Sequence, residues 1–220
     1  MIPKKQVKSK QRVVDHGEVF TAEREVKAMC DLVKSETERI ESRFLEPACG
    51  NGNFLAEVLS RKLAVVKSRY KKSPTDYERY SFLAVSSLYG VDLLEDNAVE
   101  CRERLYSLWM RQYKSIMKKE MNEECCDAVR FVIEKNILCG DALTLQKSDG
   151  TPIIFPEWSL VIGNKVKRRD FALDGMLQPS RKQMNLTMTR DEYEMGVKAF
   201  IPTPVCEFPL TEYWRVQYYG

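Results

Sequence analysis

Apolar residues along the chain follow two patterns: short runs, and longer segments in which they recur every three or four positions. The first short run, Phe44-Leu45, meets an acidic residue and then the small-residue loop 47–52. Helical spacing follows directly, at Phe54, Leu55, Val58, Leu59 and Leu63. Because such spacing indicates an amphipathic helix, the segment predicts a strand, a glycine-containing turn and a helix.

The same order recurs further along the chain. A second predicted strand covers 88–94, and an amphipathic helix follows it from about residue 96. A third strand covers 136–139, and a fourth covers 158–163. Strands that alternate with helices form parallel sheets with both faces covered. The pattern therefore predicts an α/β fold, mainly a parallel sheet with helices on both faces.

Three regions follow from the distribution of polar residues. Residues 1–16 are polar and predict a loose basic arm, 17–175 predict the folded domain, and 176–220 predict an irregular C-terminal extension. Thr21 is the expected N-cap of the first helix of the domain. In the extension, 185–188 could form a short strand. Its aromatic residues could stack on bases or pack back on the core; they are Tyr213, Trp214, Tyr218 and Tyr219.

Charge and cysteine content add little about partners. The net charge of +3 is too small to indicate a ligand, although basic residues cluster near the start of the chain and over 165–169. Basic arms often contact nucleic acid, but a solvated terminus explains the first cluster equally well. The seven cysteines form neither CxxC nor a Cys/His cluster, so we expect no metal and reduced cysteines in a cytoplasmic protein. No apolar run approaches the roughly 20 residues of a membrane helix.

The loop after the first strand carries the most specific chemistry. Gly50 and Gly52 allow the backbone to approach a ligand that a Cβ would displace. The loop lacks the lysine of a phosphate-binding loop and the third glycine of a dinucleotide-binding loop. Glu46, directly before it, suits a ligand that presents a positive or hydrogen-donating group. The alternative is a glycine turn that only joins strand to helix.

The ten residues EPACGNGNFL resemble motif I of the S-adenosylmethionine-dependent DNA methyltransferases of the adenine-N6 class, found in restriction-modification systems. The resemblance implies a Rossmann-like methyltransferase fold and S-adenosylmethionine as cofactor, with its methionine end held by the acid and the loop. The residues implied are Glu46, Pro47, Ala48, Cys49, Gly50, Gly52 and Phe54. The segment Gly17–Thr21 resembles motif X of the same family, which places Phe20 and Thr21 beside the cofactor; Ala22 stands where proline is usual.

Acids also close the second and third strands. Asp92, followed by Leu93, resembles motif II, which implies that its carboxylate accepts hydrogen bonds from both ribose hydroxyls. Asp141, followed by Ala142 and Leu143, resembles motif III, which implies a bond from the adenine amino group. Taken singly, Asp92 could be a helix cap and Asp141 a turn residue. Together with Glu46 they would meet three different parts of one ligand.

The resemblance fails at the catalytic tetrapeptide. The family carries [DNS]PP[YFW] at the end of the fourth strand, where it aligns the target amino group and stacks on the flipped base. This chain has Asn164-Lys165-Val166-Lys167. Asn164 stands at the polar position and is the candidate catalytic residue, but both prolines and the aromatic residue are missing.

Three functions remain open from the sequence. The first is a DNA methyltransferase of the adenine-N6 type, or a modification subunit that takes target recognition from another chain, with DNA and a specificity or restriction subunit as partners. The second is a catalytically inactive cofactor-binding or scaffold protein of a restriction-modification or phage-defence assembly. The third is methylation of RNA or protein, because a fold does not fix its substrate.

Overall fold

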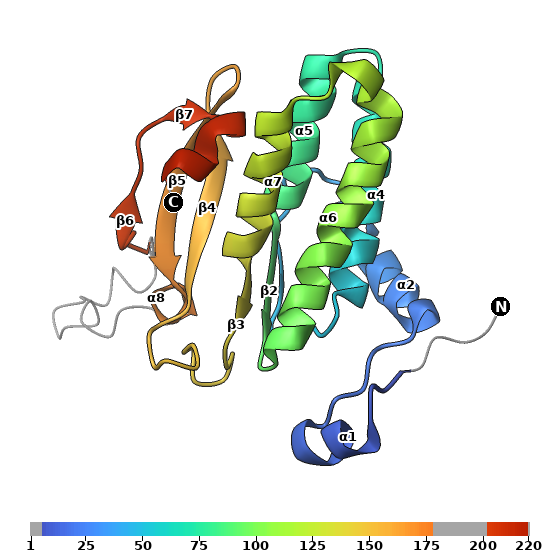
Figure 1. The fold of residues 1–220 in the computed structure, drawn as a ribbon, viewed down its shortest axis with the longest axis vertical. Helices are drawn as coiled ribbons and strands as arrows, with labels where there is room; N and C mark the ends of the chain where they lie inside the picture. Colours follow the sequence, from blue (N-terminus) through green and yellow to red (C-terminus); the bar gives the residue numbers. More distant parts are fainter. Residues whose placement is uncertain (1–5, 178–201, 220) are drawn as a thin grey trace, which may run out of the picture.

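The structure is a computed structural model that describes residues 6–177 and 202–219 (Figure 1). Its helices are α1 Lys10–His16, α2 Glu23–Leu32, α3 Lys34–Thr37, α4 Asn53–Tyr70, α5 Pro74–Ser86, α6 Glu95–Met117, α7 Glu123–Asn136 and α8 Leu173–Leu177, with 3-10 helices η1 Lys118–Glu120 and η3 Tyr213–Tyr219. Its strands are β1 Phe44–Glu46, β2 Leu88–Asp92, β3 Ile137–Cys139, β4 Ile154–Leu160, β5 Lys165–Ala172, β6 Cys206–Glu207 and β7 Thr211–Glu212.

A parallel sheet of three strands, in the order β1-β2-β3, forms the centre of the domain. Phe44 pairs with Leu88 and Gly90 with Ile137, so each strand lies beside the next one in the sequence. The first three strands were therefore predicted close to their observed positions. Because the strand order advances in one direction, right-handed connections place α4, α5, α6 and α7 on the same face, as Figure 1 shows.

The helical face holds the larger core. Leu55, Leu59 and Leu63 of α4 are fully buried, and the stacked rings of Trp109 and Tyr113 bring α6 into the same cluster. The long interval between the first two strands holds the whole of α4 and of α5. Ser73 caps α5 and Pro74 occupies its first turn, a position where proline fits because its missing N–H needs no partner.

The other face of the parallel sheet is covered mainly by β4 and the residues beside it, together with the first residue of the short helix α8. Tyr89 and Val91 alternate onto this face and pack with Ile153, Phe155 and Leu173. β4 and β5 form an antiparallel pair, and β6 and β7 both add to β5. The mixed α/β class with a parallel sheet is therefore confirmed, whereas among the described residues the long helices α4 to α7 lie on one face only.

The predicted fourth parallel strand is the origin of this difference. The apolar run over 158–163 covers the end of β4 and most of the turn over 161–164, where Val161 and Ile162 are exposed. A connection this short can join only antiparallel strands. Leu160 accordingly pairs with Val166, and the pairing continues to Ile154 with Ala172.

Segments near both ends of the described residues form helical structure that the sequence did not predict. Residues 10–16 form α1, capped by Ser9 and ended by Gly17 in the left-handed conformation, instead of belonging to a loose arm. α2 is preceded by Ala22, which makes no side-chain cap, so the prediction of Thr21 as N-cap is wrong. At the other end Tyr213 is buried and donates a hydrogen bond to Glu78 (2.7 Å), which confirms packing on the core for this residue.

Two remaining points concern the C-terminal extension and the length of the helices. The possible strand at 185–188 falls outside the described residues. Within the described residues, no helix is both long and apolar enough to cross a bilayer.

Candidate functional site

The carboxyl ends of the three parallel strands meet at the lower edge of the sheet in Figure 1. Glu46 lies opposite Gly90 in the β1–β2 pair, and Asp92 lies opposite Cys139 in the β2–β3 pair. The amide of Gly140 donates to the carbonyl of Asp92 (2.9 Å), so Asp141 follows immediately. The structure thus brings the three predicted acids to one edge, where α/β proteins bind ligands.

The loop between β1 and α4 folds back onto β2. The amide of Cys49 donates to the carbonyl of Val91 (2.9 Å), and the amide of Gly50 donates to Asp92 Oδ2 (2.8 Å). Gly50 and Gly52 have φ values of +52° and +81°, which disfavour other residues. The loop is therefore held by both the backbone and a side chain of the adjacent strand.

Close packing by the protein itself also requires the two glycines. A Cβ on Gly50 would lie 3.1 Å from the ring of Phe20, and a Cβ on Gly52 would lie 2.7 Å from Cys101 Sγ. The sequence had assigned this need to an approaching ligand. Phe20, predicted beside the cofactor, is buried against the loop and forms one of its walls.

Asp92 is a buried carboxylate that already accepts three hydrogen bonds from the protein. Oδ2 accepts from Gly50, and Oδ1 accepts from the amide of Leu94 (3.0 Å) and from Asn97 Nδ2 (3.1 Å). A carboxylate offers about four acceptor positions, so about one remains. This is enough for one ribose hydroxyl, whereas the sequence predicted two.

Glu46 is a half-buried acid at the mouth of the same loop. Burial raises its pKa, and a hydrogen bond from the backbone of Ala48 partly opposes this effect. No lysine or arginine of the described residues forms an ion pair with it, since none of the ion pairs includes this acid. A cation from a ligand would favour its ionised form.

The remaining predicted residues divide into exposed and structural ones. Asp141 Oδ1 accepts from the amide of Leu143 (2.8 Å), and this bond, together with bonds from Thr144, lowers the pKa of the carboxyl. Leu143 and Leu93 are exposed, as are Pro47 and Ala48.

Thr21 and Phe54 contact other parts of the protein through a backbone hydrogen bond and core packing, respectively. The carbonyl of Thr21 accepts from Asn53 Nδ2 (3.0 Å), while the Thr21 side chain belongs to an exposed residue. The ring of Phe54 packs against Phe44 at a centroid distance of 6.3 Å and joins the main core. Ala142 packs against the smaller cluster under the sheet.

Asn51 is a site residue that the sequence did not single out. Its Nδ2 donates to Glu100 Oε1 (3.2 Å), and this bond fixes the orientation of the amide. Its Oδ1 is buried and has no hydrogen-bond partner among the described residues. A buried acceptor without a partner costs free energy, about 1–3 kcal/mol, and a donor from a ligand would remove that cost. Its position between the two glycines was the available signal.

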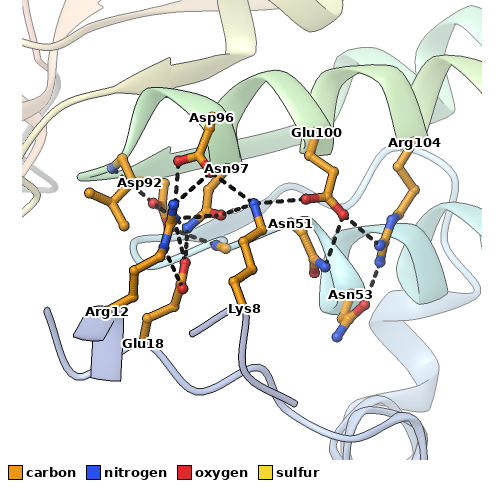
Figure 2. A network of polar contacts seen from close by, with 12 residues as sticks. Lys8, Arg12, Glu18, Asn51, Asn53, Asp92, Asp96, Asn97, Glu100 and Arg104 are labelled. Carbon is orange, nitrogen blue, oxygen red and sulfur yellow. Dashed lines mark hydrogen bonds and ion pairs between the residues drawn. The ribbon is translucent and has the colours of Figure 1, made fainter. Parts of the chain in front are cut away.

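A polar network surrounds the loop on the side of the N-terminal segment (Figure 2). Arg12 and Lys8 form ion pairs with acids at the start of α6, and Asn97 links Glu18 to Asp92. Arg12 and Asn97 lower the pKa of Glu18, and Arg12 and Lys8 hold the pKa of Asp96 well below its usual range.

Asn164 is not brought to this edge. It lies in the turn between β4 and β5, at the opposite end of the molecule from the loop (Figure 1). Its carbonyl accepts from the amide of Tyr213 (2.9 Å), and Lys165 pairs with Glu212. The catalytic assignment of Asn164 depended on a fourth parallel strand, and this strand is antiparallel.

The second basic cluster, over 165–169, is largely neutralised by acids. In the second cluster Lys167 pairs with Glu207 (3.0 Å), Arg168 with Asp170 (2.8 Å) and Arg169 with Glu157. These contacts give the cluster a structural role in the antiparallel sheet. The described residues contain no group of three or more His, Cys, Asp or Glu side chains that could hold a metal.

The edge as a whole presents acceptors. The ring of Phe20 packs against the glycine loop. Around this loop lie four acceptors: Glu46, Asn51 Oδ1, the remaining position on Asp92, and Asp141. This arrangement suits a ligand that carries several hydrogen-bond donors and a positive charge.

Comparison with known proteins agrees with this geometry. The family model described as "MmeI, DNA-methyltransferase domain" matches residues 21–164. "DNA methyltransferase A" of Bacillus subtilis (strain 168) is 28% identical over 130 residues, which cover 56% of this chain and 14% of that protein. No solved structure matches the chain. Since the family match spans more than half of the residues, the chain belongs to the family of MmeI DNA-methyltransferase domains, which confirms the resemblance to restriction-modification DNA methyltransferases.

Proposed function

We propose that this chain binds S-adenosylmethionine at the carboxyl edge of β1, β2 and β3, as the cofactor-binding part of a DNA methyltransferase of the adenine-N6 type. The observation that carries the proposal is the set of acceptors around the glycine loop. Among them, within the residues that the structure describes, are a half-buried acid that forms no ion pair and a buried amide oxygen that accepts no hydrogen bond. Family membership supplies the class of reaction.

Each of these acceptors has a suitable hydrogen-bond donor on the cofactor. Its ammonium group suits Glu46 and Asn51 Oδ1, a ribose hydroxyl suits the remaining position on Asp92, and the adenine amino group suits Asp141. Exposed apolar surface at Leu93 and Leu143 would cover the faces of the base. When bound, the cofactor supplies a methyl group on a sulfonium centre, and the residues of this chain hold and orient it.

Calorimetric titration tests the assignment of Glu46. Glu46→Gln removes the charge but keeps the shape, so we expect binding of S-adenosylmethionine to weaken roughly tenfold or more, as for a lost charge-assisted bond. Methylthioadenosine, which lacks the ammonium group, should bind both proteins equally. Glu41→Gln, an exposed acid just before β1, is the matched control. No binding of S-adenosylmethionine by the wild-type chain would refute the proposal.

The position of Asn164 favours a second function, which is cofactor binding without methyl transfer by this chain alone. Methyl transfer requires the acceptor nitrogen to be aligned with the methyl group. The sequence contains no [DNS]PP[YFW] tetrapeptide that could provide this alignment at the edge. We therefore expect binding without incorporation of tritiated methyl groups into DNA, RNA or protein. Robust methylation of adenine that is lost in Asn164→Ala would contradict this second function and restore Asn164 as a catalytic residue.

A further inference from the structure

The N-terminal segment is attached to the start of α6 by ion pairs between partly exposed side chains (Figure 2). Arg12 Nε lies 2.7 Å from Glu18 Oε2, and Arg12 Nη1 lies 2.7 Å from Asp96 Oδ2. The side chain of Glu18 is only 7% exposed. A carboxylate with so little access to water needs the guanidinium beside it.

Asn97 connects this pair to the cofactor edge. It is 1% exposed and makes bonds from both ends of its amide. Oδ1 accepts from Lys8 Nζ (2.8 Å) and Arg12 Nη2 (3.3 Å), while Nδ2 donates to Glu18 (2.7 Å) and Asp92 (3.1 Å). The cations on one side and the carboxylates on the other therefore fix the direction of the amide.

A second branch reaches the loop itself. Lys8 Nζ lies 2.9 Å from Glu100 Oε2, and Glu100 Oε1 accepts from Asn51 Nδ2 (3.2 Å). One branch thus ends at Asp92, which holds the amide of Gly50, and the other ends at Asn51. The two branches converge on adjacent residues of the loop.

We propose that Arg12 is a positioning residue of the cofactor site, acting through Glu18 and Asn97 on Asp92, so that docking of the N-terminal segment and binding of the cofactor are coupled. The proposal rests on the proposed binding of S-adenosylmethionine. Without Arg12, the carboxylates of Glu18 and Asp92 face the same amide nitrogen with less positive charge to balance them. Asp92 is then expected to turn away from Gly50, and the loop loses its support.

The coupling is electrostatic, so the affinities of variants that change charge should differ from those expected if Arg12 only contributed packing. In Arg12→Gln we expect S-adenosylmethionine to bind roughly tenfold more weakly, a change typical of a lost charge-assisted contact. Adding Glu18→Gln removes the uncompensated charge and should restore most of the affinity. Arg12→Lys should retain an intermediate affinity, because lysine keeps the positive charge but lacks the planar set of N–H donors of the guanidinium. Coupling is reciprocal, so the cofactor should slow hydrogen exchange over 6–16 in the wild type and much less in Arg12→Gln.

The experiment uses calorimetric titration of the full chain with S-adenosylmethionine, together with thermal denaturation of every variant. Arg24→Gln is the matched control, since Arg24 is 92% exposed and pairs with its neighbour Glu25. If the wild type does not bind, the proposed function itself fails. If the wild type binds and Arg12→Gln matches Arg24→Gln within twofold, the positioning role is overturned while the binding site stands. Weak binding that Glu18→Gln does not restore would also overturn it, because Arg12 would then act through packing.

Discussion

Replacing Asp92 by alanine should damage both the stability of the fold and the binding of the cofactor. The carboxylate is 9% exposed and accepts from Gly50, Leu94 and Asn97. These donors belong to the glycine loop, to the segment between β2 and α6, and to α6 itself. One side chain therefore joins three elements that meet at the site.

The expected magnitude follows from those contacts. Hydrogen bonds to a charged group contribute about 1.5–3 kcal/mol each, but bonds lost together from one side chain do not add fully, so we expect a loss of about 3 kcal/mol in the free energy of unfolding. For a domain of this size that corresponds to a decrease in Tm of roughly 6–12 °C. The affinity for S-adenosylmethionine should fall roughly thirty- to a hundredfold, since one contact to ribose and the support of the loop are both removed.

Thermal denaturation and calorimetric titration below the lowered Tm measure the two effects separately. Asp127→Ala, which alters an exposed acid on α7, is the control and should change neither quantity measurably. Asp92→Asn should also weaken binding, because its amide nitrogen must face a donor in either orientation. An Asp92→Ala protein with Tm within about 2 °C and affinity within threefold of wild type would show that the carboxylate neither holds the loop nor touches the cofactor.

Two further predictions concern the loop and the core. Gly52→Val should abolish cofactor binding while the sheet remains folded, because φ is +81° and even a Cβ would lie 2.7 Å from Cys101 Sγ; near-normal titration by a folded variant would contradict the loop assignment. Lys62 is fully buried, and burial lowers its pKa to about 7, below its value in the unfolded chain. The unfolded state then binds more protons above pH 7, so wild-type stability should rise with pH between about 7 and 10 relative to Lys62→Met; parallel stability curves for the two proteins would contradict this.

Local sequence was sufficient to predict the loop and the strand ends around it. Glu46, Asp92 and Asp141 each close a short apolar run, and the parallel pairing of those runs brings them to one edge. Periodicity also identified α4 and α6, whose buried residues follow the predicted spacing. These features depend on residues close in sequence, together with the general rule that parallel strands end at a common edge.

The polar support of the site could not be predicted in this way. Asn97 donates to Glu18 across 79 positions, and Arg12 reaches Asp96 across 84. Charged residues near a terminus predict a solvated arm unless their partners are known. The ion pairs exist because α1 folds and lies against the start of α6, and no local pattern specifies that contact.

The β4–β5 pair shows why the catalytic assignment required the structure. For Asn164 to reach the glycine loop, β4 would have to run parallel to β1 and lose its pairing from Ile154 to Leu160 with β5. It would also lose the bonds from Tyr89 to the carbonyl of Pro156 (2.9 Å) and from Trp158 to Asn136 (2.9 Å), which fasten β4 to the parallel sheet and to α7. Each lost bond would leave a buried polar group to be satisfied elsewhere. The interactions that hold β4 in place therefore also hold Asn164 away from the carboxyl edge of β1, β2 and β3, so a methyl donor bound there as proposed would not have Asn164 beside it.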